Sequence, residues 1–496
     1  MTRRVVAVDL GATSGRVMVA RVGVDPDILE LEEVHRFPNG AVRDERGALR
    51  WDISRIRREV LAGIRSAAKL GPVDGIGIDS WAIDYGLLDA DGALLGDPFS
   101  HRDSRTDGVA ERVVAEVGEE ALYDETGLQQ LPFNTLYQLV AARESEQGAK
   151  ELRHATTLLL IPDLLGFWLT GKVGAERTNA STTQFYGARS QEWSKELLDH
   201  FDLPVDILPG LLSPGDIVGT LLPDVADEVG LDASTPVLAV GSHDTASAVV
   251  GVPAGDAPFA YVSSGTWSLV GLELPDPVLT ESARRADFTN EAGVDGTVRF
   301  LKNVTGLWVL SECVRAWAND GLDGGDLESV LRSAAELPTS RRVIDINDGS
   351  LIPPGDMPGR VRALAVKGGL VAPDLPGELT RLVLDSLALA YRRCVSTGSA
   401  LAGVDPEVVH VVGGGSENEL LCQLTADACG LPVVAGPKEA AALGNVLVQS
   451  RALGVPLATL ADMRALVRRT HKLKRYEPVG SADWDRLEAR LDRASR

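Results

Sequence analysis

Two aspartates stand where they could take part in phosphate chemistry. Asp9 follows the apolar run 5–8 and precedes a turn of small residues. Such a turn leaves backbone N–H groups free to approach a phosphate, and a neighbouring carboxylate can hold Mg²⁺. Asp244 comes shortly after the apolar run 237–240, at a point where an acid could face a cleft as a general base. An ordinary tight hairpin and a helix N-cap would use the same residues, so both interpretations stay open.

Two glycine-rich segments offer further backbone for a phosphate or a nucleotide. The segment 263–266, Ser-Ser-Gly-Thr, repeats the arrangement seen after Asp9, and three glycines follow the apolar run 408–412. Glycine at a strand-to-helix junction allows a ligand to approach the backbone closely, although it can also merely tighten the turn. The chain has neither GxGxxG after a strand nor GxxxxGK[ST], which argues against dinucleotide-binding and P-loop folds.

The segment 79–84, Asp-Ser-Trp-Ala-Ile-Asp, is a candidate sugar-binding sequence. Trp81 offers a flat apolar face against which a sugar ring could pack, and carboxylates can accept hydrogen bonds from hydroxyl groups. The alternative is a tryptophan buried in the core.

The elements that would position these residues alternate between strands and helices. Two similar hairpins, one around Gly11 and one around Gly265, lie about half a chain apart and suggest an internal duplication. The run 53–70 has apolar residues at helical spacing, and a strand-like run follows it. Such alternation predicts the α/β class. The segment Gly251 to Pro258 is rich in proline and glycine and is the expected domain junction.

Composition excludes several classes of function. The 496-residue chain has a formal net charge of -22, which argues against a nucleic-acid partner. No run approaches the ~20 apolar residues of a membrane span, so no membrane association is expected. The N-terminus has no apolar stretch typical of a signal peptide, and the four cysteines form no CxxC pair. We therefore expect buried free thiols and a cytoplasmic protein.

Taken in order, the sequence blocks resemble the FGGY carbohydrate kinases, which belong to the larger group of actin-like ATPases. The resemblance runs from Val5 to about Leu453. Its blocks are AVDLGATSGRV, GIDSWAIDYGLLD, HRDSRT, ERTNASTTQ, GSHDTASAV, YVSSGTWSLVG, LKNVTGLW and VVGGGSENELLCQLTADACGLPV followed by ALGN.

The resemblance implies a fold of two actin-like (ribonuclease H-like) ATPase domains with a deep cleft between them. Residues 1–248 would bind the sugar and carry the first phosphate loop and the catalytic base. Residues 249–460 would bind the nucleotide, and residues 461–496 would form a C-terminal tail. The implied cofactors are ATP and Mg²⁺, and the implied partners are a small ketose and ATP, in a monomer or a homodimer.

The resemblance also assigns roles to single residues. Asp244 would be the catalytic base and Asp9 would lie near the metal. The substrate contacts would be Trp81, Ala82, His243, Asp244, Thr245 and Asn303. The nucleotide contacts would be Ala12, Thr13, Ser14, Gly15, Arg16, Thr266, Ser311 and Gly414. Two positions depart from the family pattern, because Ala82 stands where glycine is usual and Ser311 where glutamine is usual.

The implied reaction is ATP-dependent phosphorylation of a ketose. The wording of the SHDTASAV, SSGTWSLVG, ERTNASTTQ and GGGSEN blocks favours L-rhamnulose as acceptor, with L-rhamnulose 1-phosphate as product. Fuculose, xylulose and glycerol are alternative acceptors within the same family. An actin-like nucleotide switch that phosphorylates no small molecule is the alternative from a different class.

Overall fold

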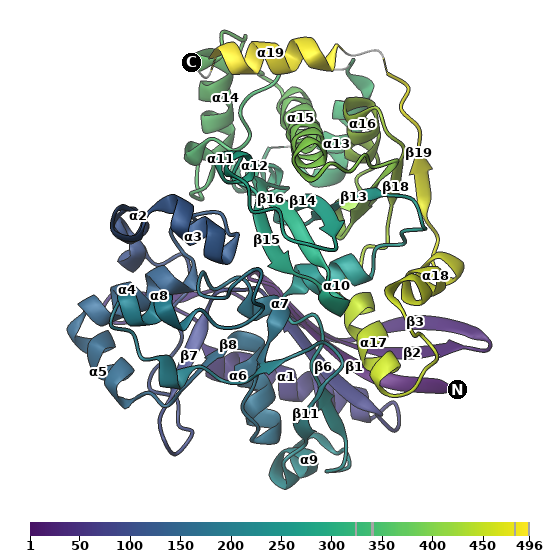
Figure 1. The fold of residues 1–496 in the computed structure, drawn as a ribbon. Helices are drawn as coiled ribbons and strands as arrows, with labels where there is room; N and C mark the ends of the chain where they lie inside the picture. Colours follow the sequence, from purple (N-terminus) through teal and green to yellow (C-terminus); the bar gives the residue numbers. More distant parts are fainter. Residues whose placement is uncertain (323–324, 339–341, 481–482, 495–496) are drawn as a thin grey trace. The chain divides into compact units, whose positions relative to one another are not determined.

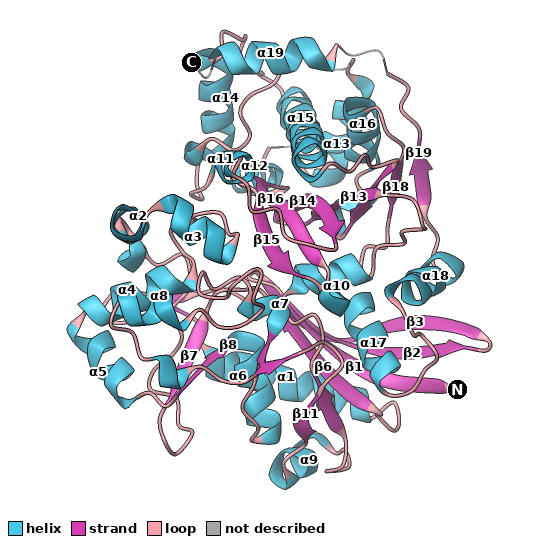
Figure 2. Ribbon diagram, in the orientation of Figure 1, coloured by secondary structure: helices cyan, strands magenta, loops and turns pink. Residues whose placement is uncertain are grey.

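The computed structural model describes residues 1–322, 325–338, 342–480 and 483–494. It divides into two compact units (Figure 1). Unit 1 consists of residues 1–251, 273–300 and 440–471, and unit 2 of residues 252–272, 301–439 and 472–496. Both units combine sheets with helices, which confirms the α/β class (Figure 2).

Unit 1 is built on a six-stranded sheet. Its strands, in spatial order, are β11 (Ile217–Thr220), β12 (Pro236–Leu238), β6 (Gly75–Ser80), β1 (Thr2–Leu10), β2 (Ser14–Val24) and β3 (Asp27–Pro38). Strands β12, β6 and β1 run parallel, whereas β2 and β3 form an antiparallel meander with β1. Because β12, β6 and β1 are parallel, their carboxyl ends share one edge of the sheet.

Helices cover both faces of this sheet. The first face packs on α1 (Ile53–Ala68), α6 (Ile161–Thr170) and α9 (Pro223–Val229), and the second on α10 (Asp244–Val250), α17 (Ala440–Ala452) and α18 (Leu460–Thr470). Strand β1 alternates accordingly: Val6 and Val8 face the first set of helices, and Val5 and Ala7 face the second. Side chains of β1 at odd positions, Asp9 among them, therefore point toward the second face.

A helical region inserted after β6 completes the core of unit 1. It contains β7 (Tyr85–Leu88), β8 (Thr157–Leu160), α2 (Val109–Val117), α3 (Glu119–Thr126), α4 (Thr135–Glu144), α5 (Glu146–His154) and α8 (Lys195–His200). A separate apolar cluster holds much of this region together. Shorter elements of unit 1 are β4 (Val42–Arg43), β5 (Leu49–Arg50), β9 (Ala175–Glu176), α7 (Arg177–Ala180), β10 (Leu211–Leu212), α11 (Glu281–Arg285) and β15 (Thr289–Ala292).

Unit 2 contains most of a second sheet. Its strands follow the order β16 (Val298–Thr305), β14 (Trp267–Leu274), β13 (Phe259–Ser264), β17 (Val408–Val412), β18 (Val433–Ala435) and β19 (Lys474–Tyr476), and β15 neighbours β16. The first three residues of β16 and the last two of β14 are counted with unit 1. The helices are α12 (Trp308–Asn319), α13 (Leu327–Glu336), α14 (Met357–Lys367), α15 (Pro376–Ala402), α16 (Glu419–Cys429) and α19 (Trp484–Ala494).

Both hairpins expected from the sequence are confirmed, as β1–β2 and as β13–β14. The helix expected at 53–70 is α1. The division into 1–248, 249–460 and 461–496 stays a prediction. Residues 460–470 form α18, which joins a core of unit 1, and residues 474–476 form β19. Within the expected tail, residues 481–482 and 495–496 lie outside the described residues.

Two further sequence expectations concern thiols and membranes. The four cysteines are unpaired; Cys313, Cys394 and Cys422 are buried as expected, whereas Cys429 is partly exposed. Among the described residues, no helix combines the length and apolarity that a bilayer span requires.

Candidate active site

Three strand ends in unit 1 bring the predicted chemistry-bearing residues of that unit together. Asp9 and Asp79 are direct partners in the parallel pairing of β1 with β6. The next residue of β6, Ser80, forms a bridge with His243, and its N–H donates to the carbonyl of Ser242 at 2.9 Å. The N–H of Trp81 donates to the carbonyl of Leu10 at 3.1 Å. This edge therefore collects Asp9, Asp79 and the segment that leads into Asp244.

Asp9 is paired with Arg16 of the following strand. Both Nε and Nη2 of Arg16 donate to Oδ2 of Asp9, at 2.9 and 2.7 Å. Asp9 is 6% exposed. Because the two hydrogen bonds share one carboxylate oxygen, Oδ1 is the oxygen better placed to meet another ligand. Arg16, expected at the nucleotide phosphates, thus also balances the charge of Asp9.

Asp79 is a fully buried carboxyl group that the sequence analysis did not assign to the catalytic chemistry. The amide of Asn445, on α17, donates to its Oδ2 at 2.5 Å, and its Oδ1 is buried without a hydrogen-bond partner. Burial raises the pKa of Asp79 well above its ordinary value, and the charges of Asp9 and Asp244 raise it further, against the opposing effect of Asn445. Asp79 therefore holds its proton more tightly than an ordinary aspartate, because several acidic groups are crowded at this edge.

Asp244 begins helix α10, next to His243. Its side chain is 34% exposed, and Nε2 of His243 lies 3.7 Å from its Oδ1. The hydroxyl of Thr245 donates to the same oxygen at 3.1 Å. Burial raises the pKa of Asp244, His243 opposes this rise, and Asp9 adds to it. A carboxylate whose pKa is raised toward neutrality is a stronger base, which suits proton abstraction.

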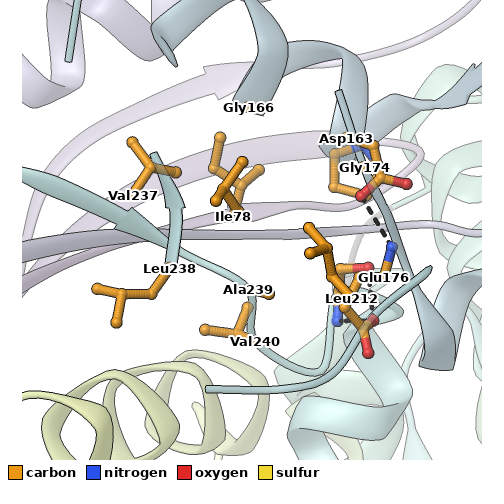
Figure 3. A pocket seen from close by; sticks show the side chains of 13 residues that line it. Ile78, Asp163, Gly166, Gly174, Glu176, Leu212, Val237, Leu238, Ala239 and Val240 are labelled. Carbon is orange, nitrogen blue, oxygen red and sulfur yellow. Dashed lines mark hydrogen bonds between the residues drawn. The ribbon is translucent and has the colours of Figure 1, made fainter. Parts of the chain in front are cut away.

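The backbone just before Asp244 is held by a buried glutamate. Oε2 of Glu176 accepts hydrogen bonds from the N–H and the hydroxyl of Ser242, at 2.9 and 2.7 Å. The N–H of Glu176 in turn donates to Oδ1 of Asp163 at 3.2 Å, at the wall of a cavity of about 20 Å³ (Figure 3). This cavity has room for about one water molecule rather than a substrate. We interpret Glu176 as a support for the loop that leads into Asp244.

Trp81 belongs to an aromatic cluster organised by one buried carboxylate. Oδ2 of Asp84 accepts from the indole N–H groups of Trp51 and Trp81, at 2.7 and 3.0 Å, and lies 2.9 Å from Nδ1 of His101. Its Oδ1 accepts from Gln138 at 3.2 Å. Asp84 is only 1% exposed, so its oxygens hold the aromatic rings in place and are not free for a sugar hydroxyl.

Ala82 lies in a strained part of this loop. The next residue, Ile83, has a φ of 69°, which is unfavourable for a β-branched side chain. Its carbonyl accepts from the hydroxyl of Thr135 at 2.8 Å and from Gln138 at 3.3 Å, which helps to keep the loop in this conformation. Backbone strain of this kind is often found at ligand sites.

The turn 11–16 is held tightly. The N–H of Gly11 donates to the carbonyl of Ser14 at 2.9 Å. Thr13 is exposed, and Ala12, Ser14 and Arg16 are partly exposed. A Cβ at Gly15 would lie 2.3 Å from the ring of Phe37, so this glycine is required by packing.

In unit 2, the turn of the second hairpin receives the start of a helix. The N–H groups of Leu307 and Trp308 donate to the carbonyls of Gly265 and Thr266, both at 3.1 Å. Thr266 is partly exposed beside Trp267, which is 36% exposed. The turn is thereby fixed to α12, the helix on which Ser311 lies exposed.

The glycine run after β17 contains residues with different roles. A Cβ at Gly413, whose φ is 81°, would lie 2.8 Å from the carbonyl oxygen of Ser264, and one at Gly415 would lie 2.0 Å from Oγ of Ser264. A Cβ at Gly414 would meet nothing within 4 Å. Packing on β13 therefore requires glycine at 413 and 415, whereas Gly414 is exposed and open to a ligand.

The predicted site residues fall into one set in each unit. Unit 1 brings together Asp9, the turn 12–16, Trp81, Ala82 and 243–245; unit 2 holds Thr266, Asn303, Ser311 and Gly414. Within unit 2, Thr266 lies on the hairpin contacted by α12 and by the glycine run, and Asn303 is partly exposed on β16. The cleft expected between two domains stays a prediction.

Comparison with known proteins identifies the family. The sequence model of the N-terminal domain of the FGGY family of carbohydrate kinases matches residues 4–251, and that of the C-terminal domain matches residues 260–453. The chain therefore belongs to the FGGY family of carbohydrate kinases.

Curated relatives share about two fifths of its sequence. A rhamnulokinase of Pectobacterium carotovorum subsp. carotovorum is 43% identical over 492 residues, which cover 98% of this chain and 96% of the relative. A rhamnulokinase of Bacteroides thetaiotaomicron is 40% identical over 486 residues, which cover 98% of each chain.

Solved structures of the same fold are more distant in sequence. The glycerol kinase of Plasmodium falciparum with ADP has a TM-score of 0.80 at 15% identity and covers 100% of this chain and 98% of its own. A gluconate kinase from Lactobacillus acidophilus has a TM-score of 0.79 at 16% identity and covers 100% and 96%. These likenesses confirm the two-domain, actin-like fold.

The first prediction concerns the carboxylate that holds the aromatic cluster. Asp84→Asn replaces an oxygen acceptor by an amide that cannot satisfy every donor around it, so we expect a loss of about 1–3 kcal/mol in the free energy of unfolding. Because two indoles lose their anchor, tryptophan fluorescence should also change. Denaturant unfolding followed by fluorescence measures both effects.

Asp89→Asn is the matched control. Asp89 accepts only backbone N–H groups in an exposed turn, where an asparagine oxygen can replace it. An Asp84→Asn variant as stable as this control would contradict the anchoring role.

Proposed function

We propose that this chain transfers the γ-phosphoryl group of ATP to L-rhamnulose and forms L-rhamnulose 1-phosphate. The observation that carries the proposal is the meeting of Asp244 with Asp9 and His243 at one edge of the unit 1 sheet. Relatives named rhamnulokinase, about 40% identical over nearly the whole chain, support the choice of sugar. We assign the reaction to the cytoplasm, as a monomer or homodimer.

In this proposal Asp244 is the general base. It takes the proton of the attacking hydroxyl while that oxygen forms a bond to the γ-phosphorus, and ADP leaves with the electrons of the broken O–P bond. Phosphoryl transfer passes through a loose transition state, so positioning and charge stabilisation do most of the catalytic work. The neighbouring residues Trp81, Ala82, His243 and Thr245 would contact the sugar in unit 1, and Asn303 would contact it in unit 2.

Divalent magnesium fits the carboxylates of unit 1. Asp9 has one oxygen directed to Arg16, and Asp79 has a buried oxygen without a partner. Mg²⁺ usually binds one or two carboxylates and keeps waters and phosphate oxygens as its other ligands. When bound, Mg²⁺ would neutralise charge on the nucleotide phosphates. Asp9 is its proposed protein ligand.

The nucleotide contacts are proposed separately for each unit. In unit 1 they are the turn residues Ala12, Thr13, Ser14, Gly15 and Arg16. In unit 2 they are Thr266, Ser311 and Gly414, of which Gly414 has the open surroundings that a nucleotide would need. A nucleotide switch without a sugar substrate would need no base beside His243, so we favour the kinase.

A panel of acceptors tests the proposed function. We expect coupled ADP-release assays with Mg-ATP to give a higher kcat/KM for L-rhamnulose than for L-fuculose, D-xylulose or glycerol. A higher value for one of the other three would move the chain to another sugar. ADP release at the same rate with and without any acceptor would favour the switch.

Asp244→Asn tests the base. Asparagine keeps the shape but cannot take a proton, so kcat should fall by about 10²–10⁴-fold, the usual contribution of general-base catalysis. Calorimetry should show ATP affinity close to that of the wild type, and the melting temperature should not fall. A variant that keeps more than about half of the wild-type kcat would remove Asp244 from this role.

Two neighbouring glycines distinguish ligand contact from packing. Gly414→Leu places a side chain in open space, so we expect unchanged stability and a KM for ATP raised by about tenfold, equivalent to ~1.4 kcal/mol. Gly415→Ala drives a methyl group into Ser264, so we expect a loss of about 1–3 kcal/mol of stability. Thermal melts and ATP titrations of both variants measure this. A Gly414→Leu variant with wild-type KM for ATP would argue against nucleotide at this position.

A further inference from the structure

A buried ion pair lies next to His243, the residue that precedes the proposed base. Arg299, on β16, is 0% exposed, and its Nη1 lies 2.9 Å from Oε2 of Glu291, on the neighbouring strand β15. Burial raises the pKa of Glu291, but the positive charge of Arg299 opposes burial, and the pKa lies below its ordinary value. A buried ion pair is often no more stabilising than apolar residues of similar size. The role of this ion pair therefore depends on what it contacts.

The ion pair contacts the ring of His243. Nη2 of Arg299 lies 3.2 Å from Nδ1 of His243, and Oε2 of Glu291 lies 3.1 Å from the same nitrogen. Nε of Arg299 donates to the carbonyl of Ala292 at 3.1 Å, which fixes the guanidinium plane. A guanidinium can only donate hydrogen bonds, and Oε2 of Glu291 is buried without a hydrogen-bond partner although it lies close to the ring, so Nδ1 of His243 is the acceptor of Arg299. The ring proton of neutral His243 is therefore on Nε2.

This tautomer directs an N–H group at the base. Nε2 of His243 lies 3.7 Å from Oδ1 of Asp244, a separation that can shorten when substrate is bound. Thr245 donates to the same oxygen. With both donors directed at Oδ1, the other oxygen, Oδ2, is better suited to receive a proton.

We propose that Arg299 and Glu291 are positioning residues for phosphoryl transfer: they hold His243 as the Nε2–H tautomer against Oδ1 of Asp244, so that Oδ2 accepts the sugar proton. The proposal rests on the function proposed above for Asp244. In the step itself the sugar O–H bond breaks, its proton passes to Oδ2, the oxygen bonds to the γ-phosphorus, and ADP departs.

The charged groups around the base set the expected direction of the pH effect. Asp9 and Asp79 face it from β1 and β6, Arg16 is paired with Asp9, and Glu176 binds the backbone at Ser242. Of the influences on the pKa of Asp244, burial and Asp9 raise it and His243 lowers it. If His243 loses its orientation, the pKa of Asp244 rises, and the acidic limb of kcat/KM moves to higher pH because the base must be ionised.

A double substitution that leaves the net charge unchanged tests the proposal. Arg299→Gln with Glu291→Gln removes both charges together, so a shift of the limb reports the loss of His243 orientation and not a change in net charge. We expect kcat to fall by about tenfold or more, less than for Asp244→Asn, with both KM values within about threefold of wild type. The acidic limb should move to higher pH.

Arg464 with Glu273 provides a matched control in the same unit. Their side chains are 8% and 10% exposed and 2.8 Å apart, and Arg464 also donates to a backbone carbonyl, that of Val249. Replacing both by glutamine should lower the melting temperature and leave kcat and the pH limb unchanged. If the two double variants have equal kcat and equal pH limbs, the positioning role is excluded.

The tautomer can be measured in the protein that keeps Arg299 and Glu291, so this test does not depend on the folding of the double variant. Nitrogen-15 NMR of histidine-labelled protein, with the His243 signal assigned by its loss in His243→Gln, distinguishes the ring nitrogens among the seven histidines. We expect a proton on Nε2 and none on Nδ1 near neutral pH. A proton on Nδ1 would overturn the inference, whereas activity retained in Asp244→Asn would overturn the base assignment itself.

Discussion

The candidate site of unit 1 depends on the register of the parallel strands β12, β6 and β1. The pairing of Asp9 with Asp79, and of Ser80 with His243, brings three segments distant in sequence to one edge. A slip of one residue would turn every side chain of a strand to the opposite face. Val6 and Val8 lie in one core and Val5 and Ala7 in the other, so both faces of β1 are buried. Because successive side chains of a strand point to opposite faces, the register of β1 decides where its carboxylate points.

That register also creates an electrostatic problem, because it places like charges close together. Asp9 raises the pKa of both Asp79 and Asp244, Asp244 raises that of Asp79, and each of the three carboxyl groups has a partner in unit 1. Arg16 binds Asp9, Asn445 donates to Asp79, and His243 faces Asp244. The balance leaves a negative edge that suits a divalent cation and a base of raised pKa, and removing any one partner would alter the others.

The parts that could be predicted from sequence are those encoded locally. In each hairpin a strand, a turn of small residues and a second strand follow one another in the sequence, so both hairpins and the position of Asp9 could be predicted. The α/β class could be predicted from the alternation of strands and helices. The partners of these residues could not be predicted, because they are distant in the sequence. Asn445 and Asp79 are 366 residues apart, and Arg299 and His243 are 56 apart. One signal was present for Asn445, since it closes the ALGN block. Nothing near Arg299 or Glu291 marked them, because an ion pair on two adjacent strands has no periodic signature.

The roles of single glycines were also beyond prediction from the sequence alone. Gly15 and Gly414 were assigned the same kind of role, contact with the nucleotide, because glycine permits close approach of a ligand. The structure separates them: a side chain at Gly15 would strike Phe37, whereas one at Gly414 would meet open space. Packing alone therefore accounts for Gly15, and ligand contact would be an additional role. At Gly414 a side chain would find space among the described residues, so packing does not account for this glycine and its contact with the nucleotide stays a prediction.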